Sequence, residues 1–410
     1  MRKAIPLGRL FGIELKVDPS WLFVFALVVW SLTSVFAAWH PLWATRTSLA
    51  VALVAAVAFF SSIVVHELAH ALVARLYGVS VRDITLHMFG GVSNLEREPP
   101  TAGAELLIAI VGPIASVTLG VAMLALAALV TGGAFNPSAP GADAAAMMAR
   151  LSPAATLLVW LGPVNLVVGL FNLIPGFPLD GGRILRAALW KSTGNLRQAT
   201  RWSTSVGRLV GLAFIVIGGA MALGLRVPFF GTGLGSGLWL ALIGMFLRGA
   251  ATQHQAGADF AAALEGVHVG TLMRTTGTTV TASASVRALV ERWLARRDES
   301  VIAVFHLDDF VGTVSMDDVA QTPPEQWDDR AAREIMTPAK DLTMLSAEEP
   351  AVEALRKMAR AGMSGLPVLD EEGTLVGMLY ERDVAQWVAL QTPPRLGSTR
   401  DGAAFPSRPA

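Results

Sequence analysis

Two histidines and a glutamate occur at a zinc-binding spacing inside an otherwise apolar stretch. Residues 61–78 read SSIVVHELAHALVARLYG. If this stretch is helical, His66 and His70 project from one face about a turn apart, so both imidazoles can reach one zinc ion. Glu67 lies beside them, where its carboxylate can polarise a water on the metal. The alternative is a pair of neutral histidines hydrogen-bonded to neighbouring helices. It is less favoured because ionisable residues inside membrane spans are rare and usually functional.

A catalytic zinc site needs a third protein ligand, and Asp180 is the strongest remaining candidate. It lies in LFNLIPGFPLDGGRIL, where the two glycines that follow it allow a sharp turn of the backbone. His87 and Glu96 compete for the role, because they lie close enough in sequence to fold back. Asp180 could instead cap a helix that begins near Gly182.

The composition indicates that part of the chain lies in a lipid bilayer. Only 16% of its 410 residues are charged and the mean hydropathy is +0.52, whereas soluble domains carry roughly 25% charged residues. The formal net charge is zero, which argues against a nucleic-acid-binding protein. The absence of cysteine excludes disulfides and thiolate sites, so any metal must be held by nitrogen and oxygen atoms.

Apolar stretches of the length needed to cross a bilayer are concentrated in the first 250 residues. We predict membrane spans at 21–39, 50–76, 104–130, 154–174, 207–225 and 237–249. Lysine and arginine gather at one set of span ends, and only Arg46, Arg150 and Arg226 lie at the other, so both termini should be cytoplasmic. The second and fourth spans then run in the same direction, which brings the two histidines and the aspartate to the cytoplasmic side together.

The chain from about residue 255 onward has the composition of a soluble protein and contains an internal repeat. TLMRTTGTTVTASASVRALVERW and EIMTPAKDLTMLSAEEPAVEALRKM align, and each is followed by two β-like stretches with a turn between them. We therefore predict a polytopic α-helical membrane domain at 1–250, a linker at 251–266, and two α/β units at 267–320 and 331–390. The tail, 391–410, is rich in Pro, Gly and Ser and is expected to be disordered.

The motifs of the membrane domain resemble those of the site-2 protease family of intramembrane zinc metalloproteases. HELAH inside a span and NLIPGFPLDGG, which begins at Asn172, are both complete. The resemblance implies that His66, His70 and Asp180 bind one zinc ion. It also implies that Glu67 is the general acid/base and that Asn172 contacts the substrate or steadies the oxyanion.

Two further segments bear on this resemblance. LHMFGGVSNL, residues 86–95, resembles the hairpin of the family, whose strand edge can pair with an extended peptide. Gly90 and Gly91 would permit close approach of the two backbones, and an ordinary cytoplasmic turn is the alternative. The family often has GPxxN in the third span, whereas GPIAS places Ser116 at the last position here, which leaves its packing role open.

The repeat resembles a pair of CBS domains. GTVSMDD, residues 312–318, fits the Gly-x-x-Ser/Thr-x-x-Asp signature, in which the hydroxyl meets phosphate and the acid binds ribose, and it implicates Ser315 and Asp318. The second unit keeps Asp383 in GMLYERD but has Tyr380 where a hydroxyl residue is expected. The resemblance implies one adenine-nucleotide site, for ATP or AMP. The alternative is a module that only forms a homodimer or braces the cytoplasmic face.

Together these features favour an intramembrane zinc endopeptidase of the plasma membrane, regulated through a cytoplasmic CBS pair. The resemblance implies a single-span membrane protein as substrate, such as a membrane-tethered transcription factor or an anti-sigma factor. One alternative is a CBS-regulated transporter or channel that uses the polar groups as an ion site. It is less favoured because the other spans are nearly purely apolar. The other alternative is a proteolytically silent relative that holds clients without cutting them.

Overall fold

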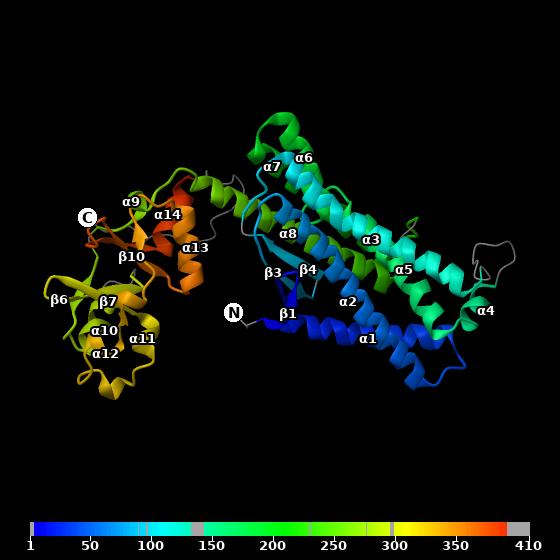
Figure 1. Cartoon of the computed structure of the whole chain (residues 1–410), viewed down its shortest axis with the longest axis horizontal. Coiled ribbons are helices and arrows are strands. Elements are labelled where there is room, and N and C mark those ends of the chain that lie inside the picture. The colour runs from blue at the N-terminus through cyan, green and yellow to red at the C-terminus, as the bar shows by residue number, and fades with distance from the viewer. Residues whose placement is uncertain are drawn as a thin grey trace, which may run out of the picture. The chain divides into compact units, whose positions relative to one another are not determined.

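The computed structural model describes residues 4–88, 90–95, 97–132, 143–228, 231–275, 277–295 and 299–391 (Figure 1). The chain divides into two compact units, Met1–Ala256 and Gly257–Ala410. This division lies close to the predicted end of the membrane domain at residue 250.

The first unit is built on helices, and within the described residues six of them are long and apolar enough to cross a membrane. They are α1 (Pro19–Trp39), α2 (Thr45–Leu76), α3 (Ala102–Val130), α5 (Pro153–Asn172), α7 (Leu196–Ala222) and α8 (Leu234–Ala263). Polar side chains cap several of them: Asp18 precedes α1, Thr101 precedes α3 and Ser152 precedes α5. Their oxygens accept hydrogen bonds from backbone N–H groups that have no partner within the helix.

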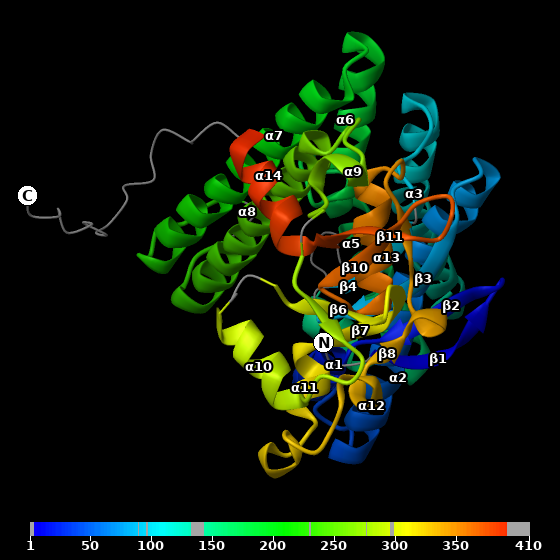
Figure 2. The same ribbon diagram turned by 90° about the vertical axis from the view of Figure 1, so that its left-hand side faces the viewer.

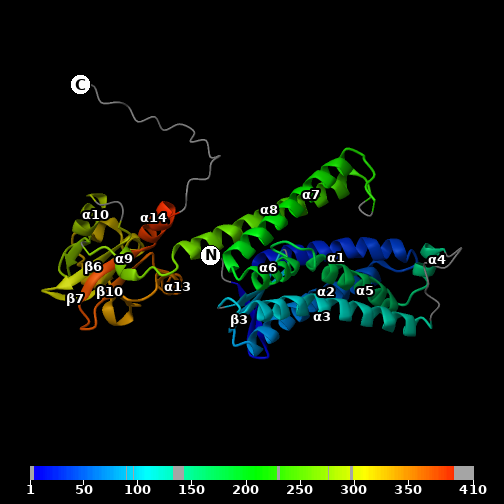
Figure 3. The ribbon, with the colours of Figure 1, turned by 90° about the horizontal axis from the view of Figure 1, so that it is seen from above.

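Each predicted span overlaps one of these helices, but the last two helices extend beyond the predicted ends. Helix α7 begins at Leu196, where the Asn195 side chain caps it. Arginines such as Arg197 and Arg201 lower the local hydropathy without breaking the helix, so the predicted span began later. Helix α8 continues to Ala263, so most of the predicted linker at 251–266 is helical. That segment is rich in alanine and contains no proline, and alanine favours helix. Figures 2 and 3 show α7 and α8 lying side by side.

A four-stranded sheet lies at one end of these helices. Its strands are β1 (Ile5–Leu10), β2 (Ile13–Val17), β3 (Val81–His87) and β4 (Gly90–Leu95), paired in that order. Strand β2 ends directly before α1, and β3 follows soon after α2. Strands β3 and β4 form the hairpin that the resemblance implied at 86–95, with His87 opposite Gly90. Strands β1 and β2 had no counterpart in the sequence-based expectation.

Helix α3 is central to the first unit, because it packs against α2, α5 and the shorter α6 (Asp180–Thr193). A buried cluster that includes Ala71, Ala74, Ile84 and Ile108 joins the sheet to α2 and α3. The remaining helix, α4 (Ala144–Ala149), is short. This packing brings the candidate site residues on α2 and α6 to one face of α3.

The second unit has the predicted repeat of strand, helix and two strands. The first half contains α9 (Val269–Leu272), β5 (Thr279–Thr281), α10 (Val286–Ala295), β6 (Val301–His306), β7 (Asp309–Ser315), α11 (Met316–Ala320) and η1 (Pro324–Gln326). The second half contains α12 (Ala332–Ile335), β8 (Thr337–Pro338), η2 (Ala339–Asp341), β9 (Leu345–Ser346), α13 (Ala351–Ala361), β10 (Gly365–Leu369), β11 (Leu375–Tyr380) and α14 (Glu381–Gln391). The sheet orders are β5-β6-β7-β8 and β11-β10-β9.

The two halves share a core, which explains an odd residue in the second motif. Tyr380 stands where a hydroxyl residue was expected, and it is 1% exposed in a cluster with Val301, Ala303 and Met378. Its phenol donates a hydrogen bond to the carbonyl oxygen of Val301, 2.9 Å away. Tyr380 therefore joins the two halves of the unit. The predicted disordered tail lies, apart from Gln391, outside the described residues.

Candidate metal centre

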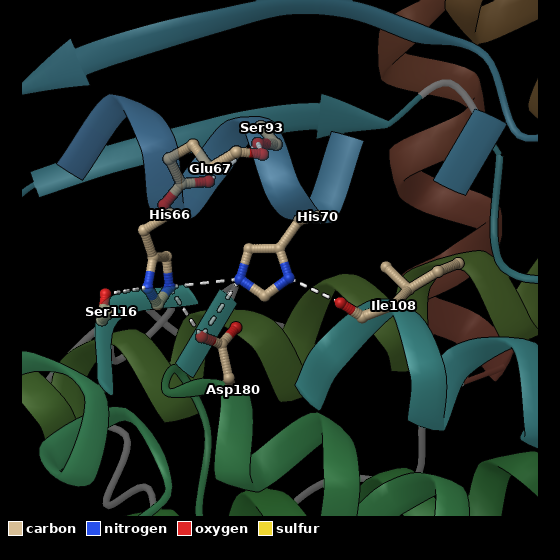
Figure 4. A network of polar contacts seen from close by, with 7 residues as sticks. All are labelled: His66, Glu67, His70, Ser93, Ile108, Ser116 and Asp180. Carbon is tan, nitrogen blue, oxygen red and sulfur yellow. Dashed lines mark hydrogen bonds and ion pairs between the residues drawn. The ribbon is translucent and has the colours of Figure 1, made fainter. Parts of the chain in front are cut away.

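Three side chains from two helices converge inside the membrane unit (Figure 4). The Nε2 atom of His66 lies 3.0 Å from Oδ2 of Asp180, and the Nε2 atom of His70 lies 3.2 Å from the same oxygen. The two Nε2 atoms are 3.2 Å apart. Among the described residues, this is the one group of three or more His, Cys, Asp and Glu side chains close enough to share a metal ion.

Each imidazole is oriented by a partner on helix α3. The Nδ1 atom of His70 lies 2.6 Å from the backbone oxygen of Ile108, which can only accept, so Nδ1 carries the proton. In the neutral ring, Nε2 then presents a lone pair to the centre of the group. The Nδ1 atom of His66 is bonded to the hydroxyl of Ser116 at 2.9 Å. Such outer partners fix the ring orientation of metal-binding histidines.

The geometry of the group fits zinc. In a tetrahedral site with metal–ligand bonds of about 2.0–2.1 Å, neighbouring ligand atoms lie about 3.3 Å apart, close to the separations found here. His66 and His70 are 5% and 4% exposed, so little water solvates their facing atoms. Lone pairs on His70 and a carboxylate at such distances repel one another unless a cation lies between them. Nitrogen and oxygen donors of this kind are ordinary zinc ligands.

The structure bears on the alternatives that the sequence left open for the third ligand. Asp180 is the first residue of α6 rather than its cap; the cap position is Leu179, which makes no side-chain cap bond. His87 ends β3 and does not belong to the group of three. Glu96 lies outside the described residues.

One face of α3 closes the site, and most of it was not identified from the sequence. Ile108, Gly112 and Ser116 follow one another at spacings of four, which places them on one side of the helix. A Cβ on Gly112 would lie 2.2 Å from Nε2 of His70 and 2.8 Å from Nε2 of His66, so only glycine fits there. In the sequence, Ser116 stands out only as a departure from the family pattern. Its position on the same face as Gly112 is the signal that could have linked it to the histidines.

Glu67 lies against the hairpin. The hydroxyl of Ser93, on β4, donates a hydrogen bond to Oε2 of Glu67 at 2.7 Å. A Cβ on Gly91 would lie 2.5 Å from Cγ of Glu67, so glycine allows the strand to pass close to the helix. In Figure 4 the two imidazoles point toward Asp180, while the Glu67 side chain lies beside Ser93. Ser93 was not singled out from the sequence.

A buried carboxylate holds the hairpin together. Asp83 on β3 is 4% exposed and accepts hydrogen bonds from Nδ2 of Asn94 at 2.6 Å and from the Thr85 hydroxyl at 2.9 Å. Nζ of Lys16 on β2 lies 3.3 Å from its other oxygen. Burial alone would raise the pKa of Asp83, but these donors outweigh it and lower the pKa below its ordinary value.

The other predicted site residues are more loosely placed. Asn172 is the last residue of α5 and is partly buried. Within the part of the chain that the structure describes, its side chain has no hydrogen bond to the three converging residues. Gly90 begins β4 with a φ of +126°, which favours glycine at the turn.

In the second unit, the residues of the CBS motifs make local contacts. The Ser315 hydroxyl and backbone N–H both donate to Oδ2 of Asp318, at 2.7 and 2.8 Å, and form a capping box at the start of α11. Asp383 accepts two hydrogen bonds from Arg274, at 2.8 and 2.6 Å. Both carboxylates thus have partners within the protein, and their role toward nucleotide stays a prediction.

Comparisons with known proteins identify the family of the chain. The model of peptidase family M50 matches residues 54–152 and 139–218, and the CBS domain model matches residues 332–390. Rip3 of Mycobacterium tuberculosis, named as a zinc metalloprotease, is 32% identical over 391 residues, which cover 95% of this chain and 93% of that protein. The chain therefore belongs to peptidase family M50, the site-2 proteases, and it carries a C-terminal CBS region.

Two further relatives extend this comparison. Protein sll0528 of Synechocystis, also named as a zinc metalloprotease, is 28% identical over 394 residues, or 96% of this chain and 97% of that protein. The solved structure of the site-2 protease from Methanocaldococcus jannaschii is 28% identical, covers 62% of this chain and 95% of its own, and gives a TM-score of 0.40. Membership of family M50 and the six apolar helices of the described residues make the chain a multi-pass membrane protein of a zinc metalloprotease family. This favours the hydrolase interpretation over the transporter or channel.

Proposed function

We propose that this protein is an intramembrane zinc endopeptidase that hydrolyses a peptide bond in the membrane-spanning helix of another protein. The observation that supports this most is the convergence of His66, His70 and Asp180, whose metal-binding atoms face one another at about the spacing zinc requires. Helix α2 supplies two of these atoms and α6 the third. When bound there, zinc polarises the scissile carbonyl and makes water acidic enough to ionise near neutral pH.

The protein's own residues hold the ligands and move the proton. Ile108 and Ser116 keep the Nε2 atoms of the histidines turned inward. Glu67, as the general base, takes a proton from the attacking water and then delivers it to the nitrogen of the leaving amine. The hydrogen bond from Ser93 holds the Glu67 carboxylate beside β4, where the substrate backbone is expected.

The free edge of β4 is the proposed binding site for the scissile segment. A helical substrate must unwind locally, and its freed backbone groups then need partners. Among the described residues, β4 is the last strand of its sheet, so one of its edges pairs with no other strand there and could pair with an extended peptide. Gly91 lies directly against Glu67, so a peptide on this edge would pass close to the proposed base. We assign Gly90 and Gly91 to this contact, and Asn172 to the substrate or oxyanion.

The wider biological role is proposed from the family resemblance and from the distribution of charge along the sequence. The substrate is a single-span regulatory protein, such as a membrane-tethered transcription factor or an anti-sigma factor. The protein resides in the plasma membrane with both termini and the CBS region in the cytoplasm, as the distribution of lysine and arginine supports. The CBS region binds ATP or AMP through Ser315 and Asp318, with Asp383 as a weaker candidate, and homodimerisation through it is compatible with this role.

Two substitutions test the proposed chemistry. In purified protein given zinc and a single-span substrate, Glu67→Gln should retain metal and lose cleavage, because the amide cannot accept the proton. Asp180→Ala should lower zinc occupancy, while His87→Ala, which changes the competing ligand, should leave it unchanged. Zinc is measured by metal analysis and cleavage by electrophoresis of the products. Cleavage by Glu67→Gln would rule out Glu67 as the base, and full occupancy in Asp180→Ala would transfer the ligand role to another residue.

A further inference from the structure

A buried ion pair joins helices α3 and α6 next to the candidate metal centre. Glu105 is 0% exposed and Arg186 is 4% exposed. Nε of Arg186 donates to Oε1 of Glu105 at 2.6 Å, and its Nη2 lies 2.5 Å from the same oxygen. Nη2 also donates to Glu98 at 2.9 Å. Apolar side chains of similar size often stabilise a core equally well, so a buried pair of this kind is weak evidence of a role in stability alone.

The Glu105 side of the ion pair lies on the face of α3 that orients the histidines. Glu105 precedes Ile108 by almost one turn of α3, so it lies on the same face as Ile108, Gly112 and Ser116. Arg186 is on α6, whose first residue is Asp180. The pair therefore ties the helix that carries the carboxylate to the helix face that fixes the imidazoles.

Arg186 also contacts the loop that leads into Asp180. Its guanidinium carbon lies 5.5 Å from the centre of the Phe177 ring, within the range of a cation–π interaction. Phe177 is 3% exposed, and its ring lies 3.9 Å, between centroids, from the His254 ring of α8. The loop before Asp180 is thus held between Arg186 and α8, while the helix after Asp180 is held to Glu105.

We infer that Arg186 is a positioning residue for the metal centre: its contacts with Glu105 and Phe177 place the Asp180 carboxylate within reach of both histidines. This inference rests on the proposed zinc site. A positioning role and a purely structural role predict different effects on zinc affinity. If the pair only stabilises the fold, its loss lowers the melting temperature and leaves zinc affinity unchanged at temperatures where the protein is folded.

The test measures metal binding rather than cleavage. Zinc affinity of the full-length protein in detergent is obtained by competition with a chromophoric chelator, and the visible absorption of the cobalt-substituted protein reports ligand geometry. Arg186→Lys keeps the charge but loses the planar fork that reaches Glu105 through two nitrogens. The double variant Glu105→Gln/Arg186→Met removes both charges, so it leaves no unpaired charge in the core even if Arg186→Met alone does not fold. Lys191→Met, an exposed cation at the other end of α6, is the matched control.

We expect Arg186→Lys and the double variant to bind zinc at least about tenfold more weakly and to show altered cobalt spectra, while Lys191→Met matches the unmodified protein. Unchanged affinity and spectrum in the folded double variant would overturn the positioning role and leave the zinc site intact. Failure of the unmodified protein to bind zinc would overturn the proposed function itself, and this inference with it.

Discussion

The proton on His70 has a direct bearing on the proposed site. Because Nδ1 of His70 faces a carbonyl oxygen, its Nε2 must be the atom that faces Asp180 with a lone pair in the neutral ring. The residue therefore cannot satisfy Asp180 by donating a hydrogen bond unless it becomes charged. A divalent cation between the two atoms removes this conflict, which is why we propose a metal site rather than a hydrogen-bonded cluster.

Gly112 offers the sharpest residue-scale prediction. Gly112→Ala places a methyl group 2.2 Å from Nε2 of His70, so an imidazole must move. We expect zinc affinity to fall at least about tenfold, with a loss of stability of about 1–3 kcal/mol from overpacking. Gly103→Ala, on the same helix, is the control, because its Cβ has no neighbour closer than 4.0 Å. Equal zinc affinity in the two variants, measured by chelator competition, would contradict the close approach of α3 to the histidines.

For single residues, the sequence is most informative where the chemistry of the side chain itself determines the residue's function. The spacing of His66 and His70 predicts that they share a site, and the glycines after Asp180 make it a candidate third member; the structure places the three residues together. The backbone oxygen of Ile108 cannot be predicted in this way, because every residue has one. Gly112 resembles an ordinary packing or hinge glycine in the sequence, since its role depends on how near another helix comes.

Among the elements, the hairpin β3–β4 depends on a small polar core. Asp83 bonds to residues on two neighbouring strands, Asn94 of β4 and Lys16 of β2. Asn94 directly follows Ser93, which contacts Glu67. The network therefore helps to keep the β4 edge next to the proposed catalytic carboxylate.

This network predicts a pH dependence of stability. The pKa of Asp83 is lower in the folded protein than in the unfolded chain, so its stabilising effect is complete above the unfolded value of about 4 and is lost as pH falls through the folded pKa. Asp83→Asn should reduce stability near pH 7 by about 2 kcal/mol and flatten the dependence below pH 4. Denaturant unfolding in detergent between pH 3 and pH 7 (roughly the range over which carboxylates titrate) measures the difference. Glu14→Gln, which changes a more exposed partner of Lys16, should shift the curve much less; identical curves for both variants would argue against this role.

Elements were predicted best where hydrophobicity is continuous. Each of the six predicted spans overlaps a helix. The start of α7 and the end of α8 were not predicted, because these segments are polar and hydropathy indicates contact with lipid rather than helical structure. The short strand β1 is exposed along its whole length and carries no alternation of buried and exposed residues. Such a strand depends on its neighbour β2, so its own sequence gives little indication of it.

The whole molecule combines a membrane unit with a unit that carries the CBS region, and helix α8 begins in one and ends in the other. The repeat in the second unit was readable from the sequence because both halves carry the same order of elements. The packing role of Tyr380 was harder to infer. Tyr380 fills the core between the halves, and such a role depends on contacts far apart in the chain.

Nucleotide binding can be tested on the intact protein. Calorimetry with ATP and AMP should detect binding, and Asp318→Ala should weaken it about tenfold or more because a charged hydrogen-bond acceptor is lost. The same change removes a capping box, at about 1 kcal/mol, so the exposed neighbour Asp317→Ala serves as the control. Absence of heat with both nucleotides would favour a bracing or dimerising role for the CBS region.

The distance along the chain between the converging residues affects how the protein is made. His70 and Asp180 are separated by 110 positions, so the ribosome completes α2 and α3 well before the carboxylate is synthesised. A nascent chain that stops short of α6 would contain the two imidazoles and Glu67 but only an incomplete set of ligands. If these residues are the ligands, the newly made protein stays inert during insertion and gains hydrolytic activity only after α6 has packed against α3.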